Sequence, residues 1–277
     1  MGRSFAWRAC AVLKRKAPLA AGMRVGIVGC GAIGSDVAKA ASTMDDVSEV
    51  LLWDIDPDAT ALLADLPRAS VVRDAAALVA GSDLIVECAN KGVVQTTCRD
   101  AMAAGKDIML LTVWALADDA LRGDLVRLAK QHGAKIHVPS GAVMGIDGIA
   151  AAKEATIRSV TLVTTKPPAG LDHAVDKWTL LFNGPARDAV KRFPKNVNVA
   201  ATLSLAGLGF DDTWVQVAVD PLATRNSHKV ILEGDFGRAR IEVENLPNPE
   251  NPKSSYLASL SAIAMLRRLV QPIQIGA

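Results

Sequence analysis

The chain has 277 residues and a mass of 29.1 kDa, which is enough for one large or two ordinary domains. Half of the residues are hydrophobic and 22% are charged, a composition that excludes intrinsic disorder and fibrous structure. The longest uncharged apolar stretch, residues 196–210, has 15 residues and is shorter than the ~20 that a membrane-spanning helix needs. We therefore expect a soluble protein with no membrane partner.

The net charge of +2 is unevenly distributed along the chain. Residues 1–22 contain five basic residues and no acidic one, so the remainder carries 26 basic and 29 acidic residues. Without that basic leader the sequence retains no basic patch with interleaved aromatic residues, and we expect no nucleic-acid partner.

The basic leader over residues 1–22 lacks the continuous apolar stretch of a secretory signal, although an Arg-rich, acid-free start is loosely typical of an organelle transit peptide. We interpret it as a disordered tail or as sequence upstream of the true start at Met23. The four cysteines have neither CxxC nor metal-ligand spacing. This pattern predicts reduced thiols, no bound metal and a cytoplasmic protein.

Between residues 23 and 140, short β-branched apolar runs alternate with Ala-rich stretches of helical period. The predicted strands are 25–28, 50–53, 84–86, 108–111 and 136–138, and the predicted helices are 33–43, 74–80, 93–104 and 117–132. Continuous apolar strands that alternate with helices predict an α/β fold of the Rossmann type, with a doubly wound parallel sheet covered on both faces.

The pattern changes after residue 140. Predicted strands at 160–165, 179–182, 214–219, 229–232 and 239–243, with helices at 186–193 and 197–205, indicate a second α+β domain with a mixed sheet over residues 141–250. A C-terminal helix is predicted within residues 251–277, with Asn251 as its N-cap and Pro252 at its first position.

A GxGxxG pattern, Gly29-Cys30-Gly31-Ala32-Ile33-Gly34, lies between the first predicted strand and the first predicted helix. In a dinucleotide site, Gly29 permits the tight turn, Gly31 lets the backbone approach a pyrophosphate at the helix N-terminus, and Gly34 lets the helix pack against the strand. The cofactor-binding candidates therefore include Ala32 and Ile33 as well as the three glycines.

An acidic residue at the end of the second strand indicates which dinucleotide binds. Asp54 lies 20 residues beyond Gly34, where its carboxylate would accept hydrogen bonds from the adenosine ribose hydroxyls. Asp56 is the competing candidate. Because a carboxylate repels a 2′-phosphate, we expect NAD as cofactor, with NADP as the alternative.

Hydride transfer to a nicotinamide needs one acid/base group and a charged or polar anchor for the substrate. Three of the four histidines, His132, His137 and His173, have positions typical of surface or structural residues. His228 follows the polar run 224–227 at the start of a strand in the second domain, and it is the catalytic candidate.

Two further segments have patterns typical of ligand binding. Residues 193–204 place two amides and a lysine at the start of an apolar helix, a pattern consistent with helix capping or with ligand binding. A second Gly-rich loop, residues 140–148, follows the fifth strand at the sheet edge where open α/β folds bind ligands.

Over residues 24–269 the sequence resembles the L-aspartate dehydrogenase family. The motifs that carry the resemblance are residues 193–204, Ser140-Gly-Ala142 with Gly145 and Asp147, Asn226-Ser-His228, Gly234-Asp-Phe-Gly237, and residues 251–257. The resemblance implies a homodimer that oxidises L-aspartate to iminoaspartate with NAD(P), the imine then giving oxaloacetate and ammonia or entering NAD biosynthesis. It also implies that His228 is the catalytic histidine and that Ala142 and Asn198 contact the nicotinamide nucleotide. The two carboxylates of the aspartate that it implies need cationic partners, for which Lys195, Arg225 and Lys253 are the candidates.

Three positions depart from the family pattern. Trp114 stands where glycine is usual, Met144 replaces a small residue, and residues 88–91 are atypical. Bulky side chains in a substrate pocket would change its volume, so we expect Trp114 and Met144 to bear on substrate choice. The alternatives left open are a related Rossmann oxidoreductase for another amino or keto acid, a relative that has drifted to a new substrate or lost activity, and an NAD(H)-sensing binding protein.

Overall fold

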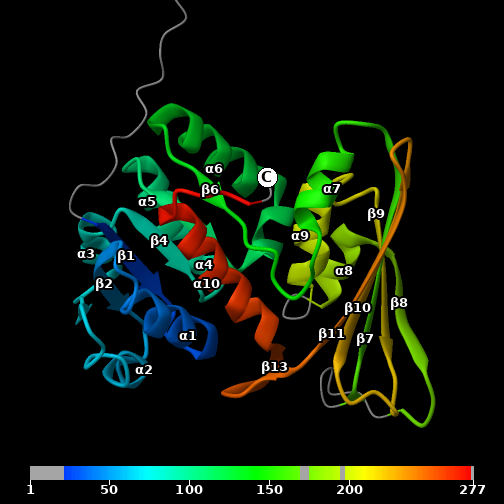
Figure 1. Cartoon of the computed structure of the whole chain (residues 1–277), viewed down its shortest axis with the longest axis horizontal. Helices are drawn as coiled ribbons and strands as arrows, with labels where there is room; N and C mark the ends of the chain where they lie inside the picture. Colours follow the sequence, from blue (N-terminus) through cyan, green and yellow to red (C-terminus); the bar gives the residue numbers. More distant parts are fainter. Residues whose placement is uncertain (1–21, 169–174, 194–196, 276–277) are drawn as a thin grey trace, which may run out of the picture.

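The computed structural model describes residues 22–168, 175–193 and 197–275, and for Pro252 and Lys253 only the backbone. Two large β-sheets lie side by side, with helices between them and around the first sheet (Figure 1). The basic leader, apart from its last residue, lies outside the described residues. None of the described helices is long and apolar enough to cross a membrane.

The first sheet is parallel and doubly wound, as the sequence predicts. Its strand order is β3-β2-β1-β4-β5-β6, so successive strands are added on one side of β1 up to β3 and on the other side from β4 onward. In a doubly wound sheet this switch point lies at the carboxyl ends of β1 and β4, where ligands bind. The strands are β1 (Met23–Val28), β2 (Val47–Trp53), β3 (Ala69–Val71), β4 (Leu84–Glu87), β5 (Asp107–Leu110) and β6 (Ile136–His137). The edge strand β3 was not predicted, because only three half-exposed residues form it.

Helices cover both faces of this sheet, which explains the continuous apolar strands. They are α1 (Ala32–Ala41), α2 (Pro57–Ala61), α3 (Ala75–Gly81), α4 (Lys91–Val93), α5 (Arg99–Ala103) and α6 (Asp119–His132). A π-helical turn, η1 (Val94–Cys98), joins α4 to α5, so the single predicted helix over 93–104 is interrupted. A 3₁₀ helix, η2 (Val113–Ala117), follows β5, and Gly133 ends α6 in the left-handed conformation.

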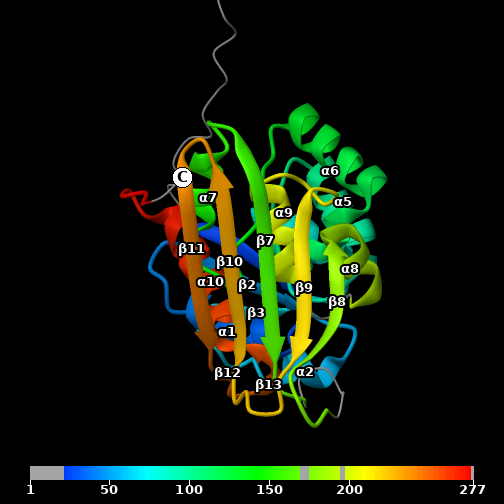
Figure 2. The same ribbon diagram turned by 90° about the vertical axis from the view of Figure 1, so that its right-hand side faces the viewer.

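The second sheet is mixed, in the order β11-β10-β7-β9-β8, with β7 and β9 parallel and the other pairs antiparallel. Its strands are β7 (Ile157–Lys166), β8 (Thr179–Pro185), β9 (Thr213–Val219), β10 (Asn226–Gly234) and β11 (Gly237–Asn245). Helices α7 (Ile146–Ala152), α8 (Ala186–Arg192) and α9 (Asn198–Ala206) lie on its inner face, toward the first sheet, whereas Figure 2 shows the outer face uncovered by the described residues.

The C-terminal helix does not begin where the sequence predicts. Residues 251–255 form strand β13 (Asn251–Ser255), which pairs with β12 (Pro247–Asn248), and helix α10 spans Tyr256–Val270. The side-chain oxygen of Asn248 accepts hydrogen bonds from the N–H groups of Glu250 and Asn251. In the first turn of a helix these N–H groups would have no backbone partner, so their bonds to Asn248 stabilise the turn instead of a helix start. Helix α10 packs beside α1 on the first sheet, burying Ala262 and Leu266.

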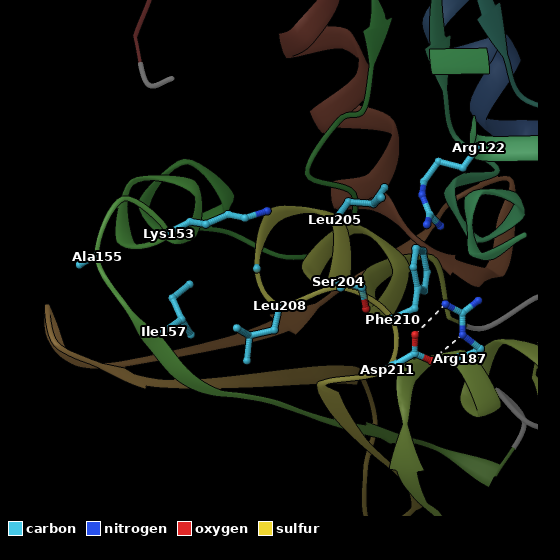
Figure 3. A pocket seen from close by; sticks show the side chains of 12 residues that line it. Arg122, Lys153, Ala155, Ile157, Arg187, Ser204, Leu205, Leu208, Phe210 and Asp211 are labelled. Carbon is cyan, nitrogen blue, oxygen red and sulfur yellow. Dashed lines mark hydrogen bonds and ion pairs between the residues drawn. The ribbon is translucent and has the colours of Figure 1, made fainter. Parts of the chain in front are cut away.

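Two arginines join the layers around one aromatic ring (Figure 3). Phe210 is 3% exposed, and the guanidinium groups of Arg122, from α6, and Arg187, from α8, lie 5.6 and 5.8 Å from its ring centroid. Arg187 also donates a 2.7 Å hydrogen bond to the carbonyl of Ala117 in η2 and forms an ion pair with Asp211. A cavity of about 490 Å³ opens beside this ring. The second sheet's helices are therefore fixed to the loop that follows β5.

We expect Phe210→Ala to lower the free energy of unfolding by about 3 kcal/mol, because it leaves a cavity and removes the surface on which both guanidinium groups pack. Urea unfolding monitored by circular dichroism measures this loss. Phe236→Ala is the matched control, since Phe236 is 39% exposed at the turn between β10 and β11. An equal loss in the two variants would contradict the role assigned to Phe210.

Candidate active site

The glycine turn after β1 is closed on one side and open on the other. Gly29 has φ +92°, and a Cβ there would lie 2.7 Å from the backbone of Cys88. A Cβ on Gly34 would lie 1.9 Å from the carbonyl oxygen of Gly29, so α1 packs on the turn only with glycine at this position. A Cβ on Gly31 would meet no atom within 4 Å. The chain therefore needs Gly29 and Gly34 for its own packing, whereas Gly31 leaves space for something else.

Helix α1 points its N-terminus into that space. Its N-cap is Gly31, which has no side chain to bond the amide N–H groups of the first turn, and the first turn carries no acidic residue. Free N–H groups at a helix N-terminus and a glycine in front of them are the features that bind a pyrophosphate. The residues present thus fit a dinucleotide.

The two candidate ribose acceptors have different partners. Asp54 follows β2, and its carboxylate accepts hydrogen bonds from the N–H groups of Cys30, at 2.6 Å, and Asp56, at 2.9 Å. The side chain of Asp56 caps the first turn of α2 through the N–H of Asp58, at 3.0 Å. Asp54 therefore lies against the glycine turn, whereas Asp56 faces its own helix.

A buried glutamate that the sequence analysis did not single out organises the neighbouring loops. Glu87 ends β4, and its carboxylate accepts hydrogen bonds from the hydroxyl and N–H of Thr112, at 2.7 and 2.9 Å, and from the N–H of Ala89, at 2.8 Å. Burial raises the pKa of this carboxyl group. Glu87 ties the loops after β4 and β5 together at the carboxyl edge of the sheet, where a dinucleotide would bind.

A cavity of about 130 Å³ lies between the two sheets. The first sheet and its loops contribute Ile33, Leu111, Val113 and Ala142, the second sheet and α9 contribute Lys166, Asn198, Thr202, Asn226 and His228, and the segment before α10 contributes Ser254 and Ser255. The structure thus brings together four candidates from the sequence: Ile33 beside the glycine turn, Ala142, Asn198 and His228.

His228 lies on the inner face of β10 and is 4% exposed. Its Nδ1 is 3.0 Å from the hydroxyl oxygen of Thr164 on β7, at hydrogen-bond distance. Burial, and the positive charge of Lys166 nearby, lower the pKa of His228 to about 3, whereas an ordinary imidazole has a pKa near 6.5. The ring is therefore neutral at physiological pH, with one nitrogen oriented by Thr164.

Lys166 is the cationic residue that the sequence analysis missed. It ends β7, is 5% exposed, and lines the same cavity as His228. Burial lowers the pKa of its amine from 10.5 to about 8. The period-2 pattern would have found it, because Lys166 shares a face with Leu162 and Thr164, but the predicted strand ended at residue 165.

The three predicted substrate cations fare differently. Arg225 does not line the cavity: its half-exposed side chain lies 3.9 Å from Glu244 and lines a separate hollow beside Trp178. The reversal of the chain between β9 and β10 directs it there. Lys195 lies outside the described residues. Lys253 lies in β13 next to Ser254, but its side chain is outside the described part of the structure.

Trp114 and Met144 do not shape the cavity, so the expectation that they alter its volume is wrong. Trp114 lines a different hollow with Ala117 and Val190, and only its backbone N–H reaches the site, donating to the side-chain oxygen of Asn198 at 3.2 Å. Met144 is 56% exposed beside α10. The 3₁₀ turn of η2 and the loop before α7 point these side chains away from the cavity.

The other histidines lie away from the cavity where they are described. His132 is exposed at the end of α6, and His137 in β6 lies 3.3 Å from Asp107. His173 falls outside the described residues. In the ranges that the structure describes, no group of three His, Cys, Asp or Glu side chains could hold a metal ion.

A Rossmann sheet with a glycine turn, joined to a mixed sheet that buries a histidine at their junction, defines a two-domain nicotinamide-dependent oxidoreductase. Residues 147–269 match the family model described as "Aspartate dehydrogenase, C-terminal", and residues 29–139 match "Homoserine dehydrogenase, NAD binding domain". The chain belongs to the L-aspartate dehydrogenase family.

Relatives over almost the whole chain support this assignment. The L-aspartate dehydrogenase of Methanosarcina acetivorans is 47% identical over 92% of this chain and 99% of its own, and that of Methanosarcina barkeri is 44% identical with the same coverage. The crystal structure of aspartate dehydrogenase from Thermotoga maritima superposes with a TM-score of 0.76 at 26% identity, covering 92% of this chain and 99% of that one. GenD2 in complex with NAD, at 14% identity and a TM-score of 0.56, shares the fold.

We expect Gly31→Val to fold normally but to lose NADH binding, because its side chain would enter the open space in front of α1 without meeting the protein. Fluorescence titration with NADH should show an affinity at least 10-fold weaker, as for the loss of about 1.4 kcal/mol. The thermal melting temperature should stay within a few degrees of the wild type. Unchanged NADH affinity would place the cofactor elsewhere.

Proposed function

We propose that this protein is an NAD(P)-dependent L-aspartate dehydrogenase, which oxidises L-aspartate to iminoaspartate that then gives oxaloacetate and ammonia or enters NAD biosynthesis. The observation that carries the proposal is the small cavity where Ile33 and Ala142, from the cofactor side, meet Asn198 and His228. The names of the relatives point to the same substrate. A protein that only senses NAD(H) has no need of a buried histidine and lysine at this position.

The cofactor would be held by the chain's own turn and loops. The N–H groups at Gly31, Ala32 and Ile33 suit the pyrophosphate, with Gly29 and Gly34 shaping the turn. Asp54 suits the adenosine ribose, which favours NAD over NADP because its carboxylate repels a 2′-phosphate. Ala142 and Asn198 suit the nicotinamide end. When bound, the oxidised nicotinamide accepts a hydride from the substrate.

The cavity offers partners for the α-ammonium group, for the transferred proton and for one carboxylate of the substrate. His228 is proposed as the acid/base residue, and because its ring is neutral it enters the reaction as a proton acceptor. The side-chain oxygen of Asn226 is buried and has no hydrogen-bond partner in the described part of the chain, so it suits the substrate ammonium. The hydroxyls of Ser254 and Ser255 suit a carboxylate, and Lys195 and Lys253 remain predictions from the sequence.

The first experiment is NADH formation by the purified protein with L-aspartate and NAD, beside NADP and a panel of other amino and hydroxy acids. We expect turnover on L-aspartate, with a higher kcat/KM for NAD than for NADP. His228→Ala should lower kcat/KM by about 100-fold or more, through loss of the acid/base group, while NADH binding persists. His132→Ala, at an exposed site, is the control. Binding of NADH without turnover of any substrate would favour the sensing alternative.

We further propose that residues 23–140 form the cofactor domain and residues 141–250 the catalytic domain of a cytoplasmic homodimer with a small-molecule substrate and no nucleic-acid partner. The outer face of the second sheet suits a second copy of the chain (Figure 2). It presents half-buried Val163 and Ile231 and 43%-exposed Trp214, beside the ion pairs Lys229–Glu242 and Arg238–Glu233. A surface with apolar groups at its centre and charges of both signs around them can be complementary to itself, so two copies can pair through it across a twofold axis.

Val163→Asp should convert this dimer to a monomer in sedimentation equilibrium, because it puts an unpaired charge at the centre of the outer face. Val71→Asp is the matched control, since Val71 is 49% exposed on the edge strand β3 of the other sheet. A monomeric wild-type protein, or a Val163→Asp variant that stays dimeric, would remove this face from the assembly.

A further inference from the structure

Four buried polar residues form a cluster at one end of the five-stranded sheet. Residues two apart on a strand share a face, so Thr164 and Lys166 on β7 lie on the inner face, as do Asn226 and His228 on β10. The register pairs His228 with Thr164, and Ser227 with Thr165, which brings the two ends together. All four side chains are 8% exposed or less. The rest of the inner face of these two strands is apolar, with Val160, Leu162, Val230 and Leu232.

Only two titratable side chains line the cavity in the part of the chain that the structure describes, His228 and Lys166. The elements packed against them contribute Val113 after β5, Asn198 and Thr202 from α9, and Ser255 before α10. Besides the two titratable side chains, the described lining residues are thus apolar groups, amides and hydroxyls. Among the described residues, the imidazole and the lysine amine are therefore the side-chain proton acceptors that this cavity offers, besides water.

We propose that Lys166 is a catalytic residue that accepts the proton of the substrate α-ammonium group. The inference rests on the proposed function and assigns one of its steps. An N–H bond of the ammonium breaks, a new N–H bond forms on the neutral Lys166 amine, and the ammonium becomes a neutral amine. Its freed lone pair forms the C=N bond of the imine as hydride leaves Cα. Lys166 then carries the proton until it exchanges with solvent.

The two bases differ in their ability to hold that proton. Burial lowers the pKa of Lys166 to about 8, so near neutral pH a fraction of the amine is unprotonated and its conjugate acid is stable. Burial and the charge of Lys166 lower the pKa of His228 further, to about 3, so the imidazole holds a proton less well than the lysine amine does. The addition of water to the imine is the other proton transfer of the reaction, and it stays assigned to His228, the acid/base residue proposed above.

The test is the pH dependence of kcat/KM for L-aspartate in the wild type, Lys166→Arg and Lys166→Ala. Wild-type kcat/KM should rise with pH through about 8, because the amine must be unprotonated to accept the proton. Arginine keeps the positive charge but does not lose it at these pH values, so Lys166→Arg should lower kcat by about 100-fold or more with a KM close to the wild-type value. Added methylamine should restore turnover to Lys166→Ala in proportion to its neutral fraction.

Controls separate this proposal from its alternatives. Lys153→Ala, at an exposed position after α7, should leave the pH profile unchanged, and NADH binding should show that both Lys166 variants fold. A Lys166→Arg variant with wild-type kcat would make Lys166 a carboxylate anchor and overturn the proposal. The proposal would also be overturned if methylamine failed to restore turnover to Lys166→Ala and the pH profile of Lys166→Arg matched that of the wild type. Absence of wild-type turnover on L-aspartate would instead refute the proposed function.

Discussion

The exclusion of water from one end of the second sheet is the constraint on which the site depends. Thr164, Lys166, Asn226 and His228 lose their solvent because α9 and the segment before α10 close over the sheet end, against the carboxyl edge of the first sheet. Desolvation disfavours charged groups, and it lowers the pKa values of Lys166 and His228 in the same direction. The packing of the two sheets against each other therefore sets the pKa values of the two basic side chains in the site.

That closure depends on contacts between the two layers away from the cavity. Arg187 reaches from α8 to the carbonyl of Ala117, and Phe210 packs between Arg187 and Arg122. Within the first sheet, Glu87 holds the loops after β4 and β5 through three hydrogen bonds. These groups do not line the cavity that contains His228, but they fix η2. Val113 of η2 lines that cavity, and the backbone N–H of Trp114 donates a hydrogen bond to the side-chain oxygen of Asn198.

Much of the fold could be predicted because the nucleotide sheet relies on local signals. Alternating apolar strands and helices gave its order of elements, and the GxGxxG turn occupies a position where two of its three glycines are sterically required. The start of α10 could not be predicted in the same way. Asn251 and Pro252 are typical of a helix start, yet Asn248 binds the N–H groups of this turn and the pairing of β12 with β13 continues to Ser255.

The sequence by itself determined the two-sheet organisation and the dinucleotide turn, because periodicity and glycine spacing act over a few residues. It made His228 a candidate through the polar run before it and the family resemblance. Tertiary structure alone decided that Lys166 joins His228 in one cavity, that Arg225 points to a separate hollow, and that Trp114 and Met144 face away. Burial and the pKa values that follow from it depend on which surfaces meet in space, and strand register brings together residues some 60 positions apart in the chain.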